Sequence, residues 1–252
     1  RLRRIGLPAP LNRVVGTIRQ AVRAANGMGY PVVVKPEAGT NAQGVTAGIE
    51  DESGVAAAFE VARAQGRRVI VEEHIEGHDY RMFVVGGRLV ATARRDPAHV
   101  VGDGRATIRQ LIERTNADPR RGAKFLNALS TIELDEAMLG LLGKSRLDGD
   151  SVPAAGTHVA LRRTANLSTG GTAVDVSDEV HPDNLWMAET VAAMSGLDII
   201  GIDFLSPDIA RPFSAVRCGI NEINIRPGLR PHFGPPGHQP DAIEIMLDEV
   251  MP

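Results

Sequence analysis

The glycine pair Gly86-Gly87 constrains what this chain can fold into more than any other feature of the sequence. It lies at the junction of two strand-like runs, 82–88 and 89–94, and paired glycines are a strong signal for a tight turn. Strands joined by so short a turn are antiparallel. The predicted hairpin therefore argues against a doubly wound parallel sheet and indicates an α+β fold.

The first third of the chain predicts the order β-loop-β-α-β after an initial helix. The run 30–36 is β-branched and closed by Pro36, which is typical of a buried strand. Asp51, Glu52 and Ser53 are each able to cap the second helix. The predicted elements are a helix over 17–29, strands over 30–36 and 45–49, a helix over 51–66 and a strand over 69–75.

The remainder of the chain predicts a longer, mixed arrangement. Its elements are the hairpin, a helix over 106–116, a strand over 159–163, a helix over 182–195 and strands over 197–204 and 219–225. With 252 residues the chain suffices for one large domain or two small ones. We find no internal repeat and no low-complexity segment.

Composition narrows the classes of protein. The net charge of −3 gives no indication of a nucleic-acid or anionic-membrane partner. The sequence has no apolar stretch of about 18 residues, as a membrane span requires. The single cysteine, Cys218, excludes an internal disulfide and fits a reducing compartment. We expect a cytoplasmic protein in which Cys218 is a strand core residue.

The two ends of the sequence suggest neighbouring domains. The chain begins without Met, in residues typical of the end of a helix, and a helical pattern over 243–250 stops at Met251-Pro252. Both ends look like cuts within a longer polypeptide. We therefore expect further domains on either side, and the sequence leaves homo-oligomerisation open.

Three oxygen-bearing side chains point to a metal site. Asp203 closes the apolar run 199–204, while Glu222 and Asn224 stand two apart on a predicted strand and so share a face. If the two strands are neighbours, these oxygens converge as hard-cation ligands suited to Mg²⁺. The alternative is that they are polar residues of an edge strand in solvent.

Lys35 and the loop after it point to phosphate binding. Lys35 ends three valines, and the loop 39–44 that follows contains Gly39 and Gly44. A lysine and a glycine loop together can contact phosphates through a point charge and backbone N–H groups. The loop lacks the ending of a Walker-type motif and leads into a strand. An ordinary hairpin turn with a solvated lysine explains the same residues.

The stretch 72–81 has the pattern of a hinge. An apolar strand runs into Glu72-Glu73-His74-Ile75 and then Gly77, and its backbone can pair with an adenine edge. Asp79 is placed to accept hydrogen bonds from ribose hydroxyls. An acidic surface strand end accounts for the same pattern.

The order of these blocks resembles the ATP-grasp superfamily, and within it the ATP-grasp domain of the cyanophycin synthetases. The resemblance covers almost the whole chain. Its blocks are the strand with Lys35-Pro36, the glycine loop, the hinge at 72–79, Asp203, and the stretches 95–104, 116–122, 164–173 and 224–232. It implies two α+β subdomains that grip ATP, a smaller one over 1–76 and a larger one over 77–252.

The resemblance also implies roles for residues that match the family's motifs. For nucleotide binding these are Lys35, Gly39, Gly44, Glu72, Glu73, Ile75 and Asp79. The metal ligands, for two Mg²⁺ ions, are Asp203, Glu222 and Asn224. The activated carboxyl and its acyl-phosphate would be held by Arg162 and the loop residues Asn166, Ser168, Gly170 and Gly171. Substrate contacts would come from Arg81, Arg230 and His232.

Two departures from the family pattern stand out. Ala42-Gln43 occupies the phosphate loop where the family usually has more glycine and a basic residue. The family's second phosphate-contacting lysine belongs to a segment that lies outside this chain.

The resemblance implies a ligase that forms an acyl-phosphate from ATP and then an amide, adding aspartate to the C-terminus of a polyaspartate backbone. Arginines would serve a polyanionic acceptor, although each one, Arg94, Arg95, Arg120, Arg121 and Arg230, is also explained as a solvated charge. Two alternatives stay open. One is a glutathione- or glutamine-dipeptide-type ATP-grasp peptide ligase, and the other is a non-catalytic nucleotide-binding scaffold.

Overall fold

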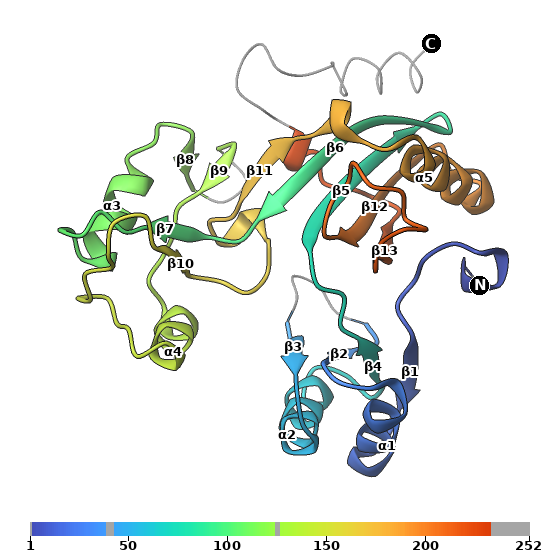
Figure 1. Cartoon of the computed structure of the whole chain (residues 1–252), viewed down its shortest axis with the longest axis horizontal. Coiled ribbons are helices and arrows are strands. Elements are labelled where there is room, and N and C mark those ends of the chain that lie inside the picture. Colours follow the sequence, from blue (N-terminus) through green and yellow to red (C-terminus); the bar gives the residue numbers. More distant parts are fainter. Residues whose placement is uncertain (1, 39–42, 124–126, 233–252) are drawn as a thin grey trace. The chain divides into compact units, whose positions relative to one another are not determined.

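The structure is a computed structural model that describes residues 2–38, 43–123 and 127–232 (Figure 1). The chain divides into two compact units. Unit 1 comprises Arg1–Gly77 and Phe204–Asn221, and unit 2 comprises His78–Asp203 and Glu222–Pro252. The division at residues 76 and 77 taken from the family resemblance stays a prediction.

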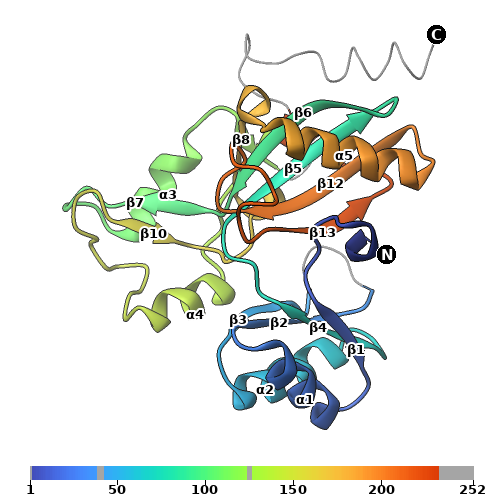
Figure 2. The same cartoon turned by 45° about the vertical axis from the view of Figure 1, so that its right-hand side comes forward.

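Unit 1 is built on an antiparallel sheet whose described strands have the order β1-β4-β2-β3. Two helices, α1 and α2, contact each other and pack on the sheet (Figures 1 and 2). The elements are the 3₁₀ helix η1 (Leu2–Ile5), β1 (Asn12–Val15), α1 (Ile18–Met28), β2 (Val32–Pro36), β3 (Thr46–Ile49), α2 (Glu52–Arg63) and β4 (Val69–Glu73).

Local signals explain why these segments become helices and a core. Thr17 caps α1 by accepting from the backbone N–H of Gln20, and Asp51 caps α2 by accepting from that of Gly54 at 2.7 Å. Alternate residues of β2, Val32 and Val34, are fully buried under the small helix residues. The predicted cap at Asp51 is therefore confirmed.

Unit 2 contains most of a sheet with the described order β11-β6-β5-β12-β13, and α5 packs on β5 and β6 (Figure 2). Strands β12 and β13 run across the division between the units. The elements are β5 (His78–Val85), β6 (Arg88–Asp96), β11 (Thr172–Asp175), the 3₁₀ helix η3 (Ser177–Glu179), α5 (Pro182–Ser195), β12 (Ile199–Ser206), β13 (Gly219–Asn224) and the 3₁₀ helix η4 (Arg230–His232).

The hairpin predicted from the glycine pair is confirmed. Val85 pairs with Arg88, and both turn glycines have positive φ, +56° for Gly86 and +78° for Gly87. This is the backbone of a type I′ turn, which glycine adopts without a steric cost. The register then shifts by one residue, because Phe83 pairs with Ala91 whereas Val84 pairs with Leu89. Val90 is the extra residue of a β-bulge.

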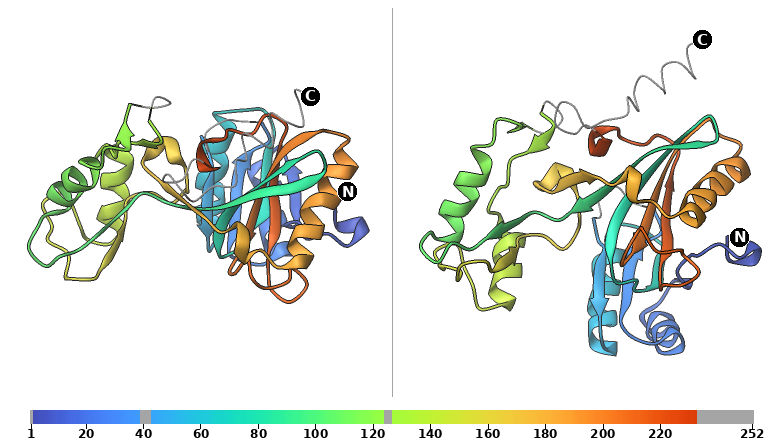
Figure 3. Two further views of the ribbon diagram at one scale, coloured as in Figure 1. Left: turned by 90° about the horizontal axis from the view of Figure 1, so that it is seen from above. Right: turned by 45° about the horizontal axis from the view of Figure 1, so that its top comes forward.

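A second, smaller group of elements in unit 2 has its own core (Figure 3). Ile108, Met138, Leu142 and Leu161 are almost fully buried within it. The elements are β7 (His99–Val101), α3 (Ile108–Asn116), β8 (Arg121–Gly122), β9 (Leu129–Ser130), α4 (Glu136–Lys144), β10 (His158–Ala160) and the 3₁₀ helix η2 (Leu167–Thr169).

Several expectations need correction. The helix α4 was not predicted, since Gly140 and Gly143 interrupt its pattern, yet Asp135 caps it. The strand predicted over 197–204 is β12, which runs from Ile199 to Ser206, and its buried residues continue through Phe204 to Ser206. The strand predicted over 159–163 is β10, which ends at Ala160. The helical pattern expected over 243–250 lies outside the described residues.

Cys218 is not the strand core residue that the sequence indicated. It directly precedes β13 and is half-buried, and its Sγ donates to the Phe213 carbonyl at 3.3 Å. Burial raises the pKa of the thiol to about 11. Separately, none of the helices in the described part of the chain is long and apolar enough to cross a bilayer.

Candidate active site

A charge network in unit 2 centres on Asp203. Arg81 donates from Nε to Oδ1 at 2.6 Å and from Nη2 to Oδ2 at 3.4 Å, and Arg95 Nη2 lies 3.0 Å from Oδ2. The side chains of Arg81, Arg95 and Asp203 are 10%, 12% and 9% exposed. The predicted metal ligand is therefore a buried carboxylate held by two guanidinium groups.

Asp79 extends the same network. Its Oδ1 accepts from Arg95 Nη2 at 2.5 Å, so one nitrogen of Arg95 joins the predicted ribose acid to the predicted metal ligand. Burial raises the pKa of Asp79 above its ordinary value, against the opposing attraction of Arg95. Arg95 is thus a buried connecting residue, and its description as a solvated surface charge is wrong.

Glu222 and Asn224 lie on β13, the neighbour of β12 in the sheet. The predicted adjacency of the two strands is therefore confirmed. Glu222 is exposed, and Asn224 Nδ2 is buried with no hydrogen-bond partner among the described residues. A carboxylate open to solvent and an amide lacking a partner leave polar groups available for an added ligand.

These residues suit magnesium by their chemistry. Two carboxylates and an amide oxygen are hard donors of the kind that Mg²⁺ accepts alongside water and phosphate oxygens. Within residues 2–38, 43–123 and 127–232, no cluster of three or more His, Cys, Asp or Glu side chains could hold a metal ion. A site built from the predicted ligands would therefore depend on the asparagine and on oxygens that a nucleotide brings.

In unit 1, Lys35 lies in β2 next to Glu72 of β4. Lys35 Nζ donates to Glu72 Oε1 at 2.9 Å and to Asn221 Oδ1 at 3.1 Å. The Lys35 side chain is 21% exposed and that of Glu72 is 8% exposed. An ammonium group has three N–H donors, so among the described residues one donor has no partner and is available for a phosphate.

The remaining predicted nucleotide residues of unit 1 shape the end of β4. Glu73 accepts from the Leu11 N–H at 3.2 Å and from Arg217 at 2.6 Å, and Ile75 is buried. Gly44 has φ of +73°, and a Cβ there would meet Gln65 Cγ at 2.8 Å. Gly39 lies outside the described residues.

The loop predicted to hold the acyl-phosphate folds around Asn166. Its side-chain oxygen accepts from the N–H and the hydroxyl of Ser168, each at 2.9 Å, and its carbonyl accepts from Gly171 N–H at 3.1 Å. Gly170 has φ of +93°, and a Cβ on Gly171 would meet the Asp96 carbonyl at 2.8 Å. Both glycines are therefore required by the backbone and its close neighbours.

Arg162, predicted to hold the activated carboxyl, is paired with an acidic side chain in unit 2. Its Nη2 forms a short ion pair with Asp135, the residue that caps α4. Arg162 holds the pKa of Asp135 below its ordinary value. Its Nε is buried without a partner in the described part of the chain.

Two predicted substrate contacts, Arg230 and His232, pack inside unit 2. Arg230 Nη2 donates to the carbonyl of Asn127 at 2.9 Å and to the hydroxyl of Ser130 at 3.2 Å. His232 is 5% exposed and stacks on Phe83 with ring centroids 5.3 Å apart. Burial, followed by repulsion from Arg81, lowers the His232 pKa to about 4, so the ring is neutral at pH 7.

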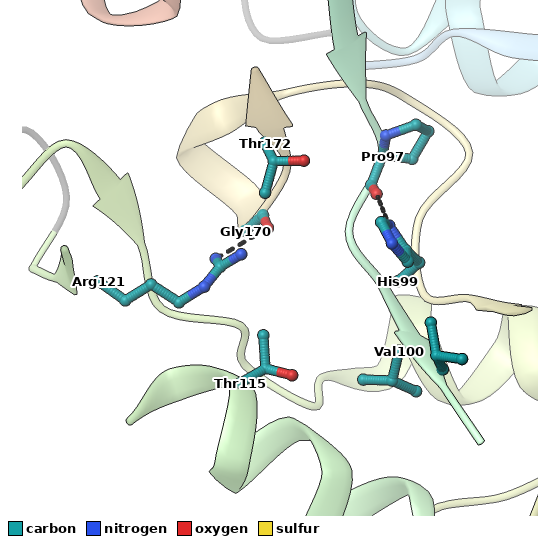
Figure 4. Close-up of a pocket in the computed structure, with 8 residues that line it drawn as sticks. Pro97, His99, Val100, Thr115, Arg121, Gly170 and Thr172 are labelled. Carbon is teal, nitrogen blue, oxygen red and sulfur yellow. Dashed lines mark hydrogen bonds between the residues drawn. The ribbon is translucent and has the colours of Figure 1, made fainter. Parts of the chain in front are cut away.

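A pocket of about 360 Å³ lies beside the Asn166 loop in unit 2 (Figure 4). Arg121 reaches Gly170 from one wall, donating from Nη1 to the Gly170 carbonyl at 3.0 Å and to the Ser130 carbonyl at 2.7 Å. Its lining residues are Pro97, His99, Val100, Val101, Thr115, Arg121, Gly170 and Thr172. The sequence indicated Arg121 as one of several arginines that would serve a polyanionic acceptor, but it did not place Arg121 in the wall of a pocket.

Comparison with known proteins agrees with this architecture. The family model described as D-ala D-ala ligase C-terminus matches residues 14–102. The chain is 45% identical over 91% of its length to a cyanophycin synthetase of Crocosphaera subtropica, spanning 27% of that protein. It is 32% identical over 93% of its length to the glutathione biosynthesis bifunctional protein of Mannheimia succiniciproducens, spanning 32% of it.

Solved structures share the fold. A bifunctional glutathione synthetase from Pasteurella multocida superposes with a TM-score of 0.66 at 29% identity, covering 98% of this chain and 35% of that one. The D-Ala:D-Ser ligase VanG of Enterococcus faecalis gives 0.54 at 16% identity, covering 99% and 57%. Sequence relatives and folds therefore lead to one assignment: the chain is an ATP-grasp domain, similar in sequence to part of the cyanophycin synthetases and of a bifunctional glutathione synthetase.

Proposed function

We propose that this chain is the ATP-using domain of a ligase that adds aspartate to the C-terminal carboxyl of a polyaspartate backbone. The observation that carries the proposal is the 45% identity to cyanophycin synthetase over 91% of the chain. Because the chain spans 27% of that relative, the activity of the whole relative is transferred here as a proposal.

Each unit, taken by itself, carries residues that the family resemblance assigns to the nucleotide. Unit 1 supplies the remaining N–H donor of Lys35 for phosphate, and it supplies the end of β4 at Glu72 and Glu73 with the buried Ile75 after it for adenine. Unit 2 supplies Asp79 for the ribose. ATP-grasp ligases use ATP and Mg²⁺, and the hard oxygen donors of Asp203, Glu222 and Asn224 suit that ion. When bound, Mg²⁺ would offset the negative charge of the phosphates.

The bond changes are those of an acyl-phosphate route. A carboxylate oxygen of the acceptor attacks the γ-phosphorus of ATP, and the bond to the β–γ bridging oxygen breaks to release ADP. The amine of aspartate then attacks the acyl carbon, loses a proton and expels phosphate. The protein contributes positioning and charge compensation. Arg162 and backbone N–H groups of the Asn166 loop are the proposed donors to the activated carboxyl.

ADP release by the intact polypeptide tests the proposal. The assay supplies MgATP with aspartate and a short aspartate peptide, and in parallel with γ-glutamylcysteine and glycine. We expect ADP release that depends on both aspartate and the aspartate peptide. Release with γ-glutamylcysteine and glycine alone would contradict the proposal and favour a glutathione-type ligase. The 32% identity to the Mannheimia protein is the observation that supports this alternative. Phosphate release that ignores every acceptor would contradict both.

A further inference from the structure

The pocket beside the Asn166 loop carries an uncompensated cation. Arg121 has five N–H donors, and its contacts with Ser130 and Gly170 use Nη1 alone. Among the described residues, neither Nε nor Nη2 of Arg121 makes a hydrogen bond. That edge of the guanidinium has the geometry that binds a carboxylate through two parallel hydrogen bonds.

The neighbouring arginine shows the opposite arrangement. Arg120 presents Nε and Nη2 to the carboxylate of Asp118 at distances of 2.6–3.2 Å, so its edge is occupied. Asp118 is also the carboxylate that acts on Arg121 electrostatically, and it is already engaged. Among the described residues, Arg120 is therefore paired with a carboxylate, whereas its neighbour Arg121 donates only to backbone carbonyls.

The other walls suit a small anionic group with a polar backbone attached. No carboxylate lines the pocket in the part of the chain that the structure describes, whereas Thr172 and Thr115 border it (Figure 4). His99 donates from Nδ1 to the Pro97 carbonyl at 2.9 Å, which leaves Nε2 as an acceptor on the neutral ring. The volume of about 360 Å³ falls in the range of roughly 300–1,000 Å³ typical of ligand pockets.

Burial makes this cation receptive to an anion. Loss of solvent lowers the Arg121 pKa from its ordinary value, and the opposing attraction of Asp118, which is already paired with Arg120, does not offset that loss. A bound carboxylate would restore that interaction where water is partly excluded. The same guanidinium holds the Gly170 carbonyl, so an anion at Arg121 would lie next to the loop proposed to hold the acyl-phosphate.

We propose that the pocket lined by Arg121, Thr172 and His99 is a carboxylate subsite for the acidic peptide acceptor. The inference rests on the proposed function and deepens it, because it assigns one side-chain or terminal carboxylate of the acceptor to a place outside the reacting centre. Arg121 recognises the carboxylate through Nε and Nη2, and Thr172 completes the polar wall.

The test compares Arg121→Gln with the matched variant Arg120→Gln in the full chain. Binding of tetra-aspartate is measured by calorimetry without ATP, with tetra-asparagine as the uncharged probe. Arg121→Gln is expected to weaken tetra-aspartate binding about ten-fold or more, as loss of a charge-assisted hydrogen-bond pair implies. Arg120→Gln is expected to change it less than about two-fold, because Asp118 already occupies that edge. Equal effects of the two variants would overturn the proposal.

A second variant separates ligand binding from the support that Arg121 gives to Gly170. Thr172→Val keeps volume and leaves both carbonyl contacts of Arg121 intact, and it is expected to weaken tetra-aspartate binding about two- to five-fold. Unchanged binding in Thr172→Val together with a lowered Tm in Arg121→Gln would overturn the subsite and leave Arg121 as a structural residue.

Turnover distinguishes failure of the subsite from failure of the proposed function. If the proposed function is right, Arg121→Gln raises KM for the aspartate peptide and leaves KM for ATP unchanged. Absence of any peptide-dependent ADP release in the unmodified protein, with Arg121-dependent peptide binding intact, contradicts the ligase proposal alone. Normal turnover with an unchanged peptide KM in Arg121→Gln contradicts the subsite alone.

Discussion

The two units each hold a charged group that the family resemblance assigns to the nucleotide site, half-buried Lys35 in unit 1 and buried Asp203 in unit 2, and they neutralise it differently. In unit 1, Lys35 donates to one carboxylate and one amide oxygen, which leaves its third donor without a partner in the part of the chain that the structure describes. In unit 2, Asp203 accepts from two arginines on both of its oxygens. The comparison teaches that Lys35 is placed to receive a ligand, whereas Asp203 is first a structural anchor.

Removing Asp203 should have the largest effect. Asp203→Ala leaves Arg81 and Arg95 buried without their shared carboxylate, and we expect a loss of about 3–5 kcal/mol in the free energy of unfolding. Urea unfolding measures this. Asp203→Asn, which keeps the shape but not the charge, serves as the control. A loss below about 1 kcal/mol in the alanine variant would show that Asp203 is not an anchor.

Glu222, in contrast to Asp203, should matter for ATP turnover and little for stability. Its side chain is exposed, so Glu222→Ala is expected to change unfolding free energy by less than about 0.5 kcal/mol. Turnover of ATP by the intact polypeptide should fall by at least about a hundred-fold, because loss of a magnesium ligand removes charge compensation. Near-normal turnover would remove Glu222 from the metal site. Asn221→Ala, one residue earlier on β13, is the matched control.

The unit 2 network should also make stability depend on pH through His232. The folded ring has a pKa of about 4 and the unfolded ring about 6.5, so only the unfolded chain binds a proton between these values. Stability is therefore full above pH 6.5 and falls as the pH drops towards 4, by about 3 kcal/mol in total. The measurement is urea unfolding across this range. His232→Phe, which keeps an aromatic ring beside Phe83, should be less sensitive; an identical pH slope would contradict the assignment.

Lys35→Ala tests whether the lysine of unit 1 is placed to bind a phosphate. ATP affinity should fall about 10- to 30-fold, because one charge-assisted contact to phosphate is lost. Equilibrium binding of a non-hydrolysable ATP analogue measures this. Asn221→Ala removes the neighbouring acceptor and keeps the ammonium group, so it should retain affinity. Unchanged binding in Lys35→Ala would count against a phosphate role.

The smallest effect is expected for Arg217→Ala in unit 1. Arg217 is 62% exposed, and its pair with Glu73 is an exposed ion pair that contributes about 0–1 kcal/mol. Urea unfolding at low and high salt checks this. A loss of several kcal/mol would mean that unit 1 also depends on a charge anchor, and the contrast with Asp203 would no longer hold.

Local signals in the sequence predicted much of the fold. The Gly86-Gly87 turn, the cap at Asp51 and the helix between Pro182 and Gly196 depend on residues close together in the chain, and the structure confirms them. Helix α4 was missed because its glycines disfavour a helix in isolation, while burial of Met138 and Leu142 stabilises it.

Long-range partners could not be predicted in the same way. Counting back from the turn without a bulge places Arg94 opposite Asp79, but the extra residue Val90 shifts the register so that Arg95 pairs there instead. The residues around Val90 contain no local signal that predicts this bulge. The ion pair of Arg162 with Asp135 likewise joins residues 27 positions apart. The family resemblance predicted a role for Arg162 at the activated carboxyl, but it did not predict that Asp135 would be its partner.

Cys218 has a practical consequence for spectroscopy on this protein. It is the single cysteine, half-buried, with a pKa near 11, so at neutral pH its sulfur is almost entirely protonated and reacts slowly with alkylating reagents. The native chain should therefore react little with thiol-labelling reagents at neutral pH. A cysteine introduced at an exposed helix position, such as Val61 of α2, would carry a fluorophore at one defined point without first removing the native thiol.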